Sequence, residues 1–211
     1  MFRKLAILIA IVFAFYGLIR LFTPAPEITN PKPRGENLIC FGDSLTFGTG
    51  APPELSYPAQ LSRLMGRPVI NAGRPGDTTA SALARLEEDV LAHSPSIVFI
   101  TLGGNDLRTG VGGKAAFGNL KTIIESIQAR GALVVLGGLS FPIWDRGYGT
   151  GYRETAEDTG AVLVPDILDE IMGREELMSD PIHPNAKGYA IMAARFFAAV
   201  EPYLHGSSSG D

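Results

Sequence analysis

The sequence predicts an α/β fold, a three-layer α/β/α sandwich around a five-stranded parallel sheet. Short apolar runs alternate with amphipathic segments along the chain, an order typical of parallel strands joined by right-handed helical crossovers. The runs are apolar almost throughout, as strands covered on both faces are. A hydrophobic content of 45% and a charged content of 19% suit a chain that buries such a core.

Five runs are predicted as strands. Each is rich in Val, Ile, Leu or Phe and is bounded by Gly, Pro or polar residues. The clearest is the run from Ser96 to Leu102, which contains no charged residue. In chain order the predicted strands are 37–41, 68–71, 96–102, 132–136 and 161–164.

Helical periodicity predicts the elements between these strands. The segment 79–93 carries Ala82, Leu86 and Val90 at helical spacing, so one face is expected to be buried. Its charged residues are expected to form a solvated face; they are Arg85, Glu87, Glu88 and Asp89. Three further helices are predicted at 57–65, 114–130 and 189–203.

The first 35 residues are predicted to lie outside the domain. Residues 1–22 combine a basic start with an uncharged run and are interpreted as an uncleaved membrane anchor, with a cleaved signal peptide as the alternative. Four prolines predict a stiff, extended linker over 23–35. The domain is expected to span 36–205, and residues 206–211 are expected to be a disordered tail.

Charge and cysteine content exclude several functional classes. The net charge is −4 and the basic residues are scattered, so no nucleic-acid partner is expected. The single cysteine, Cys40, excludes an internal disulfide and a cysteine-rich metal site. It lies inside the first predicted strand and is interpreted as a core residue. No cofactor is predicted, and the sequence leaves the oligomeric state open.

Ser44 is the candidate nucleophile. It follows the first predicted strand in the turn Gly42-Asp43-Ser44, at the edge where open α/β sheets place their ligands. A serine hydroxyl is a poor nucleophile at neutral pH unless a neighbouring base takes its proton. Because Gly-Asp-Ser also occurs in ordinary turns, the assignment depends on finding that base elsewhere in the chain.

His183 is the candidate base. Of the three histidines, His93 ends a predicted helix and His205 lies in the tail, whereas His183 falls in a loop at the same edge as Ser44. Asp180 could orient one ring nitrogen and leave the other facing Ser44, as in a Ser-His-Asp triad. The alternative is that Asp180 and His183 only cap the last helix.

Two residues are candidates for stabilising negative charge on a substrate oxygen. Gly76 follows the second strand and would let a backbone N–H approach closely, and Asn105 follows the third strand and offers a side-chain amide. The alternatives are that Gly76 only permits a turn and that Asn105 only caps the next segment.

Taken together, these segments resemble the SGNH or GDSL-type hydrolases. The resemblance extends from about Asn37 to Tyr203 and is greatest to the bacterial lysophospholipase, thioesterase and arylesterase branch. Four blocks carry it in the order of the family: Phe41-Gly42-Asp43-Ser44-Leu45, Asn71 through Thr78, Gly103-Gly104-Asn105-Asp106, and Asp180-Pro181-Ile182-His183-Pro184.

The resemblance implies a flavodoxin-like strand order and a serine esterase that hydrolyses carboxylic or thio esters through an acyl-enzyme. It implies Ser44 as nucleophile, His183 as base and Asp180 as the partner that orients it. It also implies an oxyanion site made by the N–H groups of Ser44 and Gly76 and the side chain of Asn105, with no metal. The predicted anchor, which departs from the soluble or secreted members of the family, indicates a location at the bacterial inner membrane with a periplasmic catalytic domain. Secretion after cleavage is the alternative.

The substrate is the least determined feature. The loop 139–148 follows the fourth strand and is predicted to line the acyl pocket through Phe141, Ile143, Trp144 and Tyr148; the alternative is that it packs on its own domain. An anchor beside a bilayer favours small esters or lipid esters such as lysophospholipids. A carbohydrate O-acetylesterase on the same fold is the alternative.

Two other functional classes are also considered. A two-metal phosphoesterase could draw ligands from five residues, but only one of its candidate ligands is a histidine. These are Asp43, Asn105, Asp106, Asp180 and His183. An inactive binding module is the other class, and the complete set of catalytic residue types argues against it.

Overall fold

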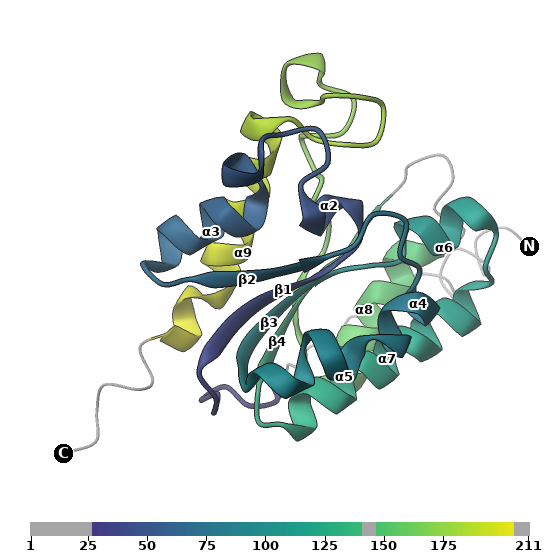
Figure 1. Ribbon diagram of the computed structural model, residues 1–211. Helices are drawn as coiled ribbons and strands as arrows, with labels where there is room; N and C mark the ends of the chain where they lie inside the picture. The colour runs from purple at the N-terminus through teal and green to yellow at the C-terminus, as the bar shows by residue number, and fades with distance from the viewer. Residues whose placement is uncertain (1–26, 141–146, 205–211) are drawn as a thin grey trace, which may run out of the picture.

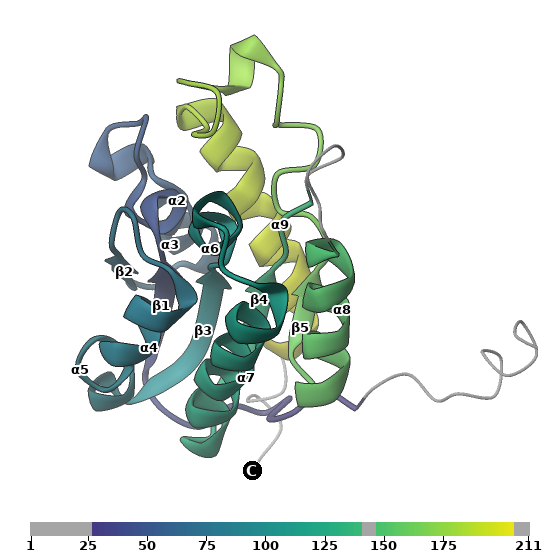
Figure 2. The ribbon, with the colours of Figure 1, turned by 90° about the vertical axis from the view of Figure 1, so that its right-hand side faces the viewer.

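A five-stranded parallel sheet forms the centre of the molecule, in the order β2-β1-β3-β4-β5 (Figure 1 labels the first four strands of this order and Figure 2 adds β5). The computed structural model describes residues 27–140 and 147–204. The strands are β1 (Asn37–Gly42), β2 (Val69–Gly73), β3 (Pro95–Thr101), β4 (Leu133–Gly137) and β5 (Val162–Val164). Every neighbouring pair is parallel, so the predicted fold class and strand order are confirmed.

Helices cover both faces of the sheet (Figure 2). One face carries α3 (Tyr57–Met65) and α9 (Ala186–Leu204). The other face carries α4 (Thr79–Ala84), α5 (Leu86–Asp89), α7 (Gly113–Ala129) and α8 (Tyr148–Thr159). Two short helices, α2 (Ser44–Phe47) and α6 (Gly104–Thr109), begin where β1 and β3 end. Three 3-10 turns complete the described elements, at Pro53–Leu55, Leu91–His93 and Glu175–Leu177.

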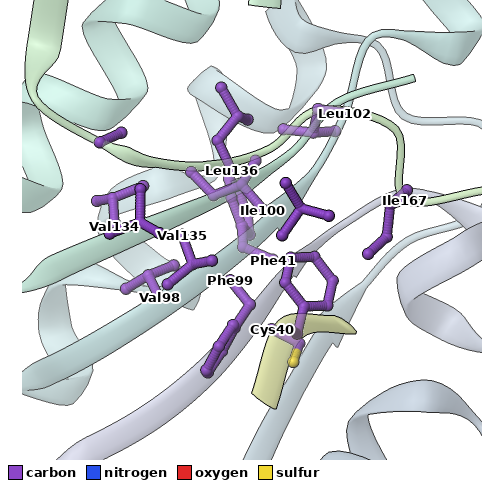
Figure 3. Close-up of a cluster of buried hydrophobic side chains, with 14 of the residues drawn as sticks. Cys40, Phe41, Val98, Phe99, Ile100, Leu102, Val134, Val135, Leu136 and Ile167 are labelled. Atoms are coloured by element: carbon purple, nitrogen blue, oxygen red, sulfur yellow. The ribbon is translucent and has the colours of Figure 1, made fainter. Parts of the chain in front are cut away.

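The core lies between the sheet and these helices (Figure 3). All seven residues of β3 and all five of β4 are buried, as their apolar sequences predict. Phe196 of α9 packs edge-on against Phe99 of β3, with ring centroids 5.4 Å apart. Cys40 has no exposed surface, so its interpretation as a core residue is confirmed. A rigid sheet of this kind fixes the positions of the loops that leave its carboxyl edge.

The continuous helix predicted at 79–93 is wrong. The segment forms α4, α5 and the 3-10 turn Leu91–His93, and the backbone leaves helical geometry at Arg85, where φ is −107° and ψ is 5°. Arg85 was expected in the solvated face but is only 7% exposed, because its guanidinium turns inward to Asp77 and Asp89. Glu87 and Glu88 are exposed, as expected.

Part of the predicted linker belongs to the folded domain. Residues 27–35 lie at the end of the sheet where the strands begin, opposite to the end that carries α2 and α6, and are hydrogen-bonded there. The N–H of Thr29 donates to the carbonyl of Gly160 at 2.9 Å, and the Asn30 side chain donates to the carbonyls of Gln128 and Ala132. These contacts attach to the domain a proline-rich segment that composition alone predicts to be a stiff, extended linker.

Helix α8 has no counterpart among the predicted elements. Its sequence contains Gly149 and Gly151, which weaken helical propensity. Gly151 is required by packing: a Cβ at this position would lie 2.2 Å from an atom of the Phe117 ring. The helix therefore depends on its contact with α7, which local sequence does not reveal.

The predicted membrane anchor, residues 1–22, and the predicted tail, 206–211, lie outside the described residues. Within 27–140 and 147–204, no helix is both long enough and apolar enough to cross a bilayer.

Candidate active site

Ser44 is the first residue of α2, directly beyond the carboxyl end of β1. The preceding residue, Asp43, caps this helix, and its carboxylate accepts a hydrogen bond from the N–H of Leu45 at 3.0 Å. Gly42 is required by close packing, because a Cβ there would lie 2.2 Å from Oγ1 of Thr46 and 2.3 Å from the carbonyl oxygen of Thr101. The turn therefore holds the serine between β1 and β3, where the strand order reverses.

Asp180 and His183 are held in one tight turn before α9. Oδ1 of Asp180 accepts hydrogen bonds from the backbone N–H groups of Ile182, at 2.9 Å, and His183, at 2.8 Å. The backbone N–H of Ser179 donates to the carbonyl of His183 at 2.9 Å and closes the turn. The three-residue spacing between aspartate and histidine is thus the spacing of an Asp-stabilised turn.

The structure brings the three predicted triad residues together. Nδ1 of His183 lies 2.7 Å from Oδ2 of Asp180, and Nε2 of the same ring lies 3.0 Å from Oγ of Ser44. One imidazole thus connects a carboxylate to a serine hydroxyl from the opposite end of the domain. The alternative, in which Asp180 and His183 only cap the last helix, leaves the contact to Ser44 unexplained.

Asn105 lies in the first turn of α6, beside the loop that follows β2. Its Nδ2 donates to the backbone carbonyl of Asp77 at 2.9 Å and lies 3.4 Å from Oδ2 of Asp43. Its Oδ1 accepts from the guanidinium of Arg108 at 3.1 Å, which fixes the orientation of the amide. Gly76, next to Asp77, is exposed and has a φ of +87°, a conformation that glycine adopts without strain.

The pKa values of the two carboxylates near Ser44 are shifted in opposite directions, one by burial and the other by hydrogen bonding. Burial raises the pKa of Asp43 to about 6, although the hydrogen bond from Leu45 partly offsets it. The hydrogen bond from the His183 ring and that from the N–H of Ile182 lower the pKa of Asp180. Asp180 is therefore ionised at neutral pH and able to hold the imidazole in the orientation seen here.

A cavity of about 350 Å³ opens beside Ser44 and His183. Asp43, Asn105 and Arg108 contribute to its polar side. Gly104 and six apolar side chains also line it: Leu45, Leu107, Leu139, Leu168, Met172 and Ile182. Sequence reasoning missed most of this lining. The available signal was position, because these residues lie in or next to segments that leave the carboxyl ends of β1, β3, β4 and β5.

Of the four residues predicted to line the acyl pocket, the structure describes only Tyr148. Phe141, Ile143 and Trp144 lie outside the described residues. The structure places Tyr148 away from the cavity: it is 2% exposed, its hydroxyl donates to the carbonyl of Val111 at 3.2 Å, and its ring lies 5.1 Å from that of Phe117. Tyr148 begins α8 and packs against α7, so its prediction as a substrate contact is corrected.

The ligand set considered for a phosphoesterase is not assembled. Asp106 is fully buried, and its two carboxylate oxygens accept from the N–H of Thr79 at 2.9 Å and the hydroxyl of Thr79 at 2.7 Å. Over the residues with described positions, no three His, Cys, Asp or Glu side chains are grouped as metal ligands would be. Asp106 instead ties α6 to the start of α4.

Comparison with known proteins agrees with this geometry. The model of the GDSL-like lipase/acylhydrolase family matches residues 40–191. An arylesterase of Vibrio mimicus is 33% identical over 184 residues, which cover 81% of this chain and 90% of the relative. The thioesterase 1/protease 1/lysophospholipase L1 of Escherichia coli (strain K12) is 26% identical over 181 residues, covering 82% and 87%.

A solved structure extends the similarity to three dimensions. The crystal structure of TesA superposes with a TM-score of 0.76 at 28% sequence identity and covers 80% of this chain and 100% of its own. The family match, the esterase relatives and the shared fold agree with one another. The chain therefore belongs to the GDSL-like lipase/acylhydrolase family and is a serine hydrolase that acts on ester bonds.

Proposed function

We propose that Ser44, His183 and Asp180 are the catalytic triad of this esterase. The observation that carries the proposal is the unbroken hydrogen-bonded line from Oδ2 of Asp180 through the His183 ring to Oγ of Ser44, with distances of 2.7 and 3.0 Å. With its Nδ1–H donated to Asp180, the neutral imidazole has an unprotonated Nε2, which accepts the hydrogen bond of the Ser44 hydroxyl.

The reaction proceeds in two acyl-transfer steps. Nε2 of His183 takes the Ser44 proton as Oγ attacks the ester carbonyl, and the resulting imidazolium returns that proton to the departing alcohol or thiol. In the second step a water molecule gives a proton to His183 and attacks the acyl-serine. The acid leaves, and the proton returns to Ser44.

The oxyanion site is proposed to consist of the N–H groups of Ser44 and Gly76 and the side-chain amide of Asn105. Two contacts support it: Asn105 lies beside Asp43, the residue before Ser44, and donates to Asp77, the residue after Gly76. These contacts bring the three donor segments to one place. When substrate binds, its oxygen would take the place of Oδ2 of Asp43, which lies 3.4 Å from Nδ2 of Asn105, as an acceptor for this amide.

The substrate is proposed to be a small aryl or lipid ester, or the corresponding thioester, with its acyl chain in the apolar cavity. Leu107, Leu168, Met172 and Ile182 offer this chain a surface without charge. A carbohydrate O-acetylesterase would need room for only two acyl carbons. The size and apolar lining of the cavity therefore favour the longer chain.

Residues 1–22 are proposed to anchor the domain at the bacterial inner membrane, with the enzyme in the periplasm, and residues 23–26 to begin its connection to the domain. Secretion after cleavage is the alternative. Membrane fractionation of the full chain beside a chain lacking residues 1–22 distinguishes them. Recovery of the full chain in the soluble periplasmic fraction, shortened at its N-terminus, would contradict the anchor.

The triad is tested with the variant Ser44→Ala and a series of p-nitrophenyl esters from acetate to laurate. We expect a loss of roughly 10⁵- to 10⁶-fold in kcat for every ester, an unchanged melting temperature, and loss of the covalent adduct with a fluorophosphonate. Ser126→Ala, at a half-buried serine on α7 that is not among the cavity residues, is the matched control. Substantial turnover by Ser44→Ala would refute the triad, and a wild-type maximum at acetate would favour the O-acetylesterase.

A further inference from the structure

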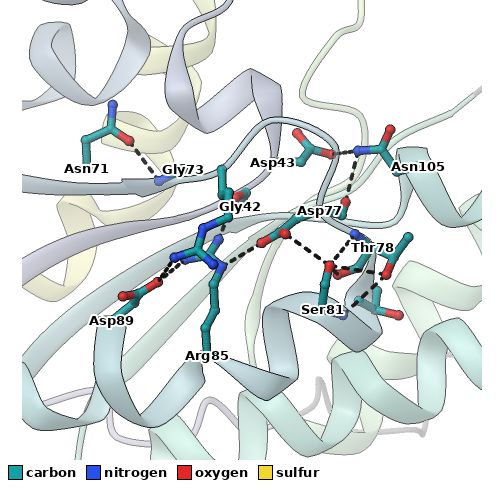
Figure 4. A network of polar contacts seen from close by, with 12 residues as sticks. Gly42, Asp43, Asn71, Gly73, Asp77, Thr78, Ser81, Arg85, Asp89 and Asn105 are labelled. Carbon is teal, nitrogen blue, oxygen red and sulfur yellow. Dashed lines mark hydrogen bonds and ion pairs between the residues drawn. The ribbon is translucent and has the colours of Figure 1, made fainter.

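Arg85 joins two of the loops that carry the proposed oxyanion donors (Figure 4). Its Nη2 donates to the carbonyl of Gly42 at 3.0 Å, and its Nε pairs with Oδ2 of Asp77 at 2.6 Å. The guanidinium also pairs with Asp89 through Nη1 and lies over the Phe41 ring, 4.5 Å from its centroid. One cation thus contacts the end of β1 and the loop after β2 at the same time.

The third donor is connected to the same cluster through Asp77. The side chain of Asp77 binds Arg85 and accepts a hydrogen bond from the hydroxyl of Ser81 at 3.0 Å. The backbone carbonyl of Asp77 accepts a hydrogen bond from Nδ2 of Asn105. Gly42 stands two residues before Ser44, and Asp77 directly follows Gly76. The contacts of Arg85 therefore reach each donor segment either directly or through one residue.

Stability alone does not explain why these charged side chains are buried together. Arg85 and Asp77 have side chains only 6% and 7% exposed, and the desolvation of a buried ion pair commonly cancels its Coulombic gain. A planar guanidinium can, however, donate in several fixed directions at once, which neither an apolar side chain nor a lysine can do. The buried ion pair is explained if Arg85 holds the loops that it contacts at fixed positions relative to one another.

We propose that Arg85 is a positioning residue for ester hydrolysis: it fixes the spacing between the Ser44 and Gly76 backbone amides, and it fixes Asn105 through Asp77. Arg85 does not line the cavity, so it acts on the reaction through these groups. The inference rests on the proposed oxyanion site. A displacement of donors by a fraction of an ångström weakens hydrogen bonds that the tetrahedral intermediate needs more than the bound ester does.

The test compares Arg85→Met and Arg85→Lys with the wild-type enzyme, with kcat expressed per site titrated by a fluorophosphonate. We expect kcat to fall roughly 10- to 100-fold in Arg85→Met while KM changes less than about 2-fold, and Arg85→Lys to lie between. The inhibition constant of a trifluoromethyl ketone, whose adduct with serine carries an oxyanion, is expected to rise by the same factor as kcat falls.

A control separates positioning from simple loss of stability. Val98→Ala removes buried volume from β3, and Val98 is not among the cavity residues. It is expected to lower the melting temperature without changing kcat per titrated site. Asp77→Asn is a second variant for the case in which Arg85→Met does not fold, because it keeps the backbone carbonyl that binds Asn105. Asp77→Asn is expected to lower kcat by a similar factor and to leave KM nearly unchanged.

The inference is overturned if the Arg85 and Asp77 variants that fold keep wild-type kcat per titrated site and wild-type ketone affinity. It is also overturned if Val98→Ala loses kcat to the same extent. Such outcomes leave the proposed triad intact as long as Ser44→Ala is inactive. Activity in Ser44→Ala would instead remove the proposed function itself.

Discussion

Two aspartates flank Ser44, and their surroundings differ in almost every respect. Asp43 precedes the serine in sequence and is 3% exposed, and its contacts belong to the helix cap and to Asn105. Asp180 reaches the site from the other end of the chain, has a side chain that is 43% exposed, and is bound to the His183 ring and to its own turn. The pKa of Asp43 is raised to about 6, and that of Asp180 is lowered.

The comparison teaches that one residue type supplies two different functions within one site. Asp180 accepts three hydrogen bonds from its own turn and the imidazole, which stabilise its charge where water can also reach it. Asp43 carries its charge inside the protein, at a cost to stability, and caps the helix that begins with Ser44. Removing either charge should therefore affect activity and stability in different proportions.

The largest effect is expected for Asp180→Asn. An amide cannot hold the imidazole with its Nε2 unprotonated and facing Ser44, so kcat should fall roughly 10³- to 10⁴-fold. The melting temperature should change little, because the side chain is exposed. Steady-state kinetics and thermal unfolding measure both. Glu175→Gln, at an exposed carboxylate shortly before the turn, is the control and should behave as wild type. Retention of a tenth of the activity by Asp180→Asn would refute the orienting function.

Asp43→Asn should lower activity less and raise stability. The new amide places a donor against Nδ2 of Asn105, where Asp43 offered an acceptor at 3.4 Å, so kcat should fall about 10-fold. The difference between a pKa of about 6 and the ordinary 3.8 corresponds to roughly 3 kcal/mol of unfolding free energy, so a gain of about 1–3 kcal/mol is expected at pH 7. Urea denaturation measures it, and a loss of stability would contradict the burial argument.

The same comparison predicts a pH dependence of stability. Between about pH 4 and 6 the folded protein holds the Asp43 proton that the unfolded chain releases, so this residue's contribution to stability is present at low pH and is lost as the pH rises through 6. The advantage of Asp43→Asn should be near zero at pH 4 and largest above pH 6. Denaturation of both proteins at pH 4, 5, 6 and 7 measures it. A constant difference across this range would show that charge burial is not its cause.

The smallest effect concerns the cavity. Met172→Ala enlarges its apolar side, so the ratio of kcat/KM for laurate over butyrate should rise roughly 2- to 10-fold while the value for acetate stays unchanged. Leu64→Ala, at an exposed leucine on α3, should leave the ratio unchanged. An identical chain-length profile in Met172→Ala would place the acyl chain elsewhere.

The local parts of the fold and of the site were predictable from sequence. Short apolar runs identify all five strands, most clearly β3 and β4, which are buried along their whole length. Ser44 and Asn105 follow such strands directly, and Asp180 and His183 stand three residues apart in one turn. Each of these signals lies within a few residues, and the parallel topology then brings the loops to one edge.

Features that depend on distant contacts were mispredicted or missed. The break at Arg85 comes from a guanidinium drawn toward Asp77 and Gly42, and helix α8 depends on the fit of Gly151 against Phe117. Residues 27–35 read as a spacer because their hydrogen-bond partners lie about 100 or more residues away in the chain.

By itself, then, the sequence determined the sheet and the reaction class and singled out the residues that we propose carry the reaction, because periodicity and short motifs record local geometry. Only the tertiary structure decided which charges are buried, which side chains line the cavity, and how Asp43 and Arg85 organise the loops around Ser44. The physical reason is that desolvation and ion pairing depend on what surrounds a group in space. Some of these neighbours lie far away along the chain, as Gly42 does from Arg85 and Asn105 from Asp43.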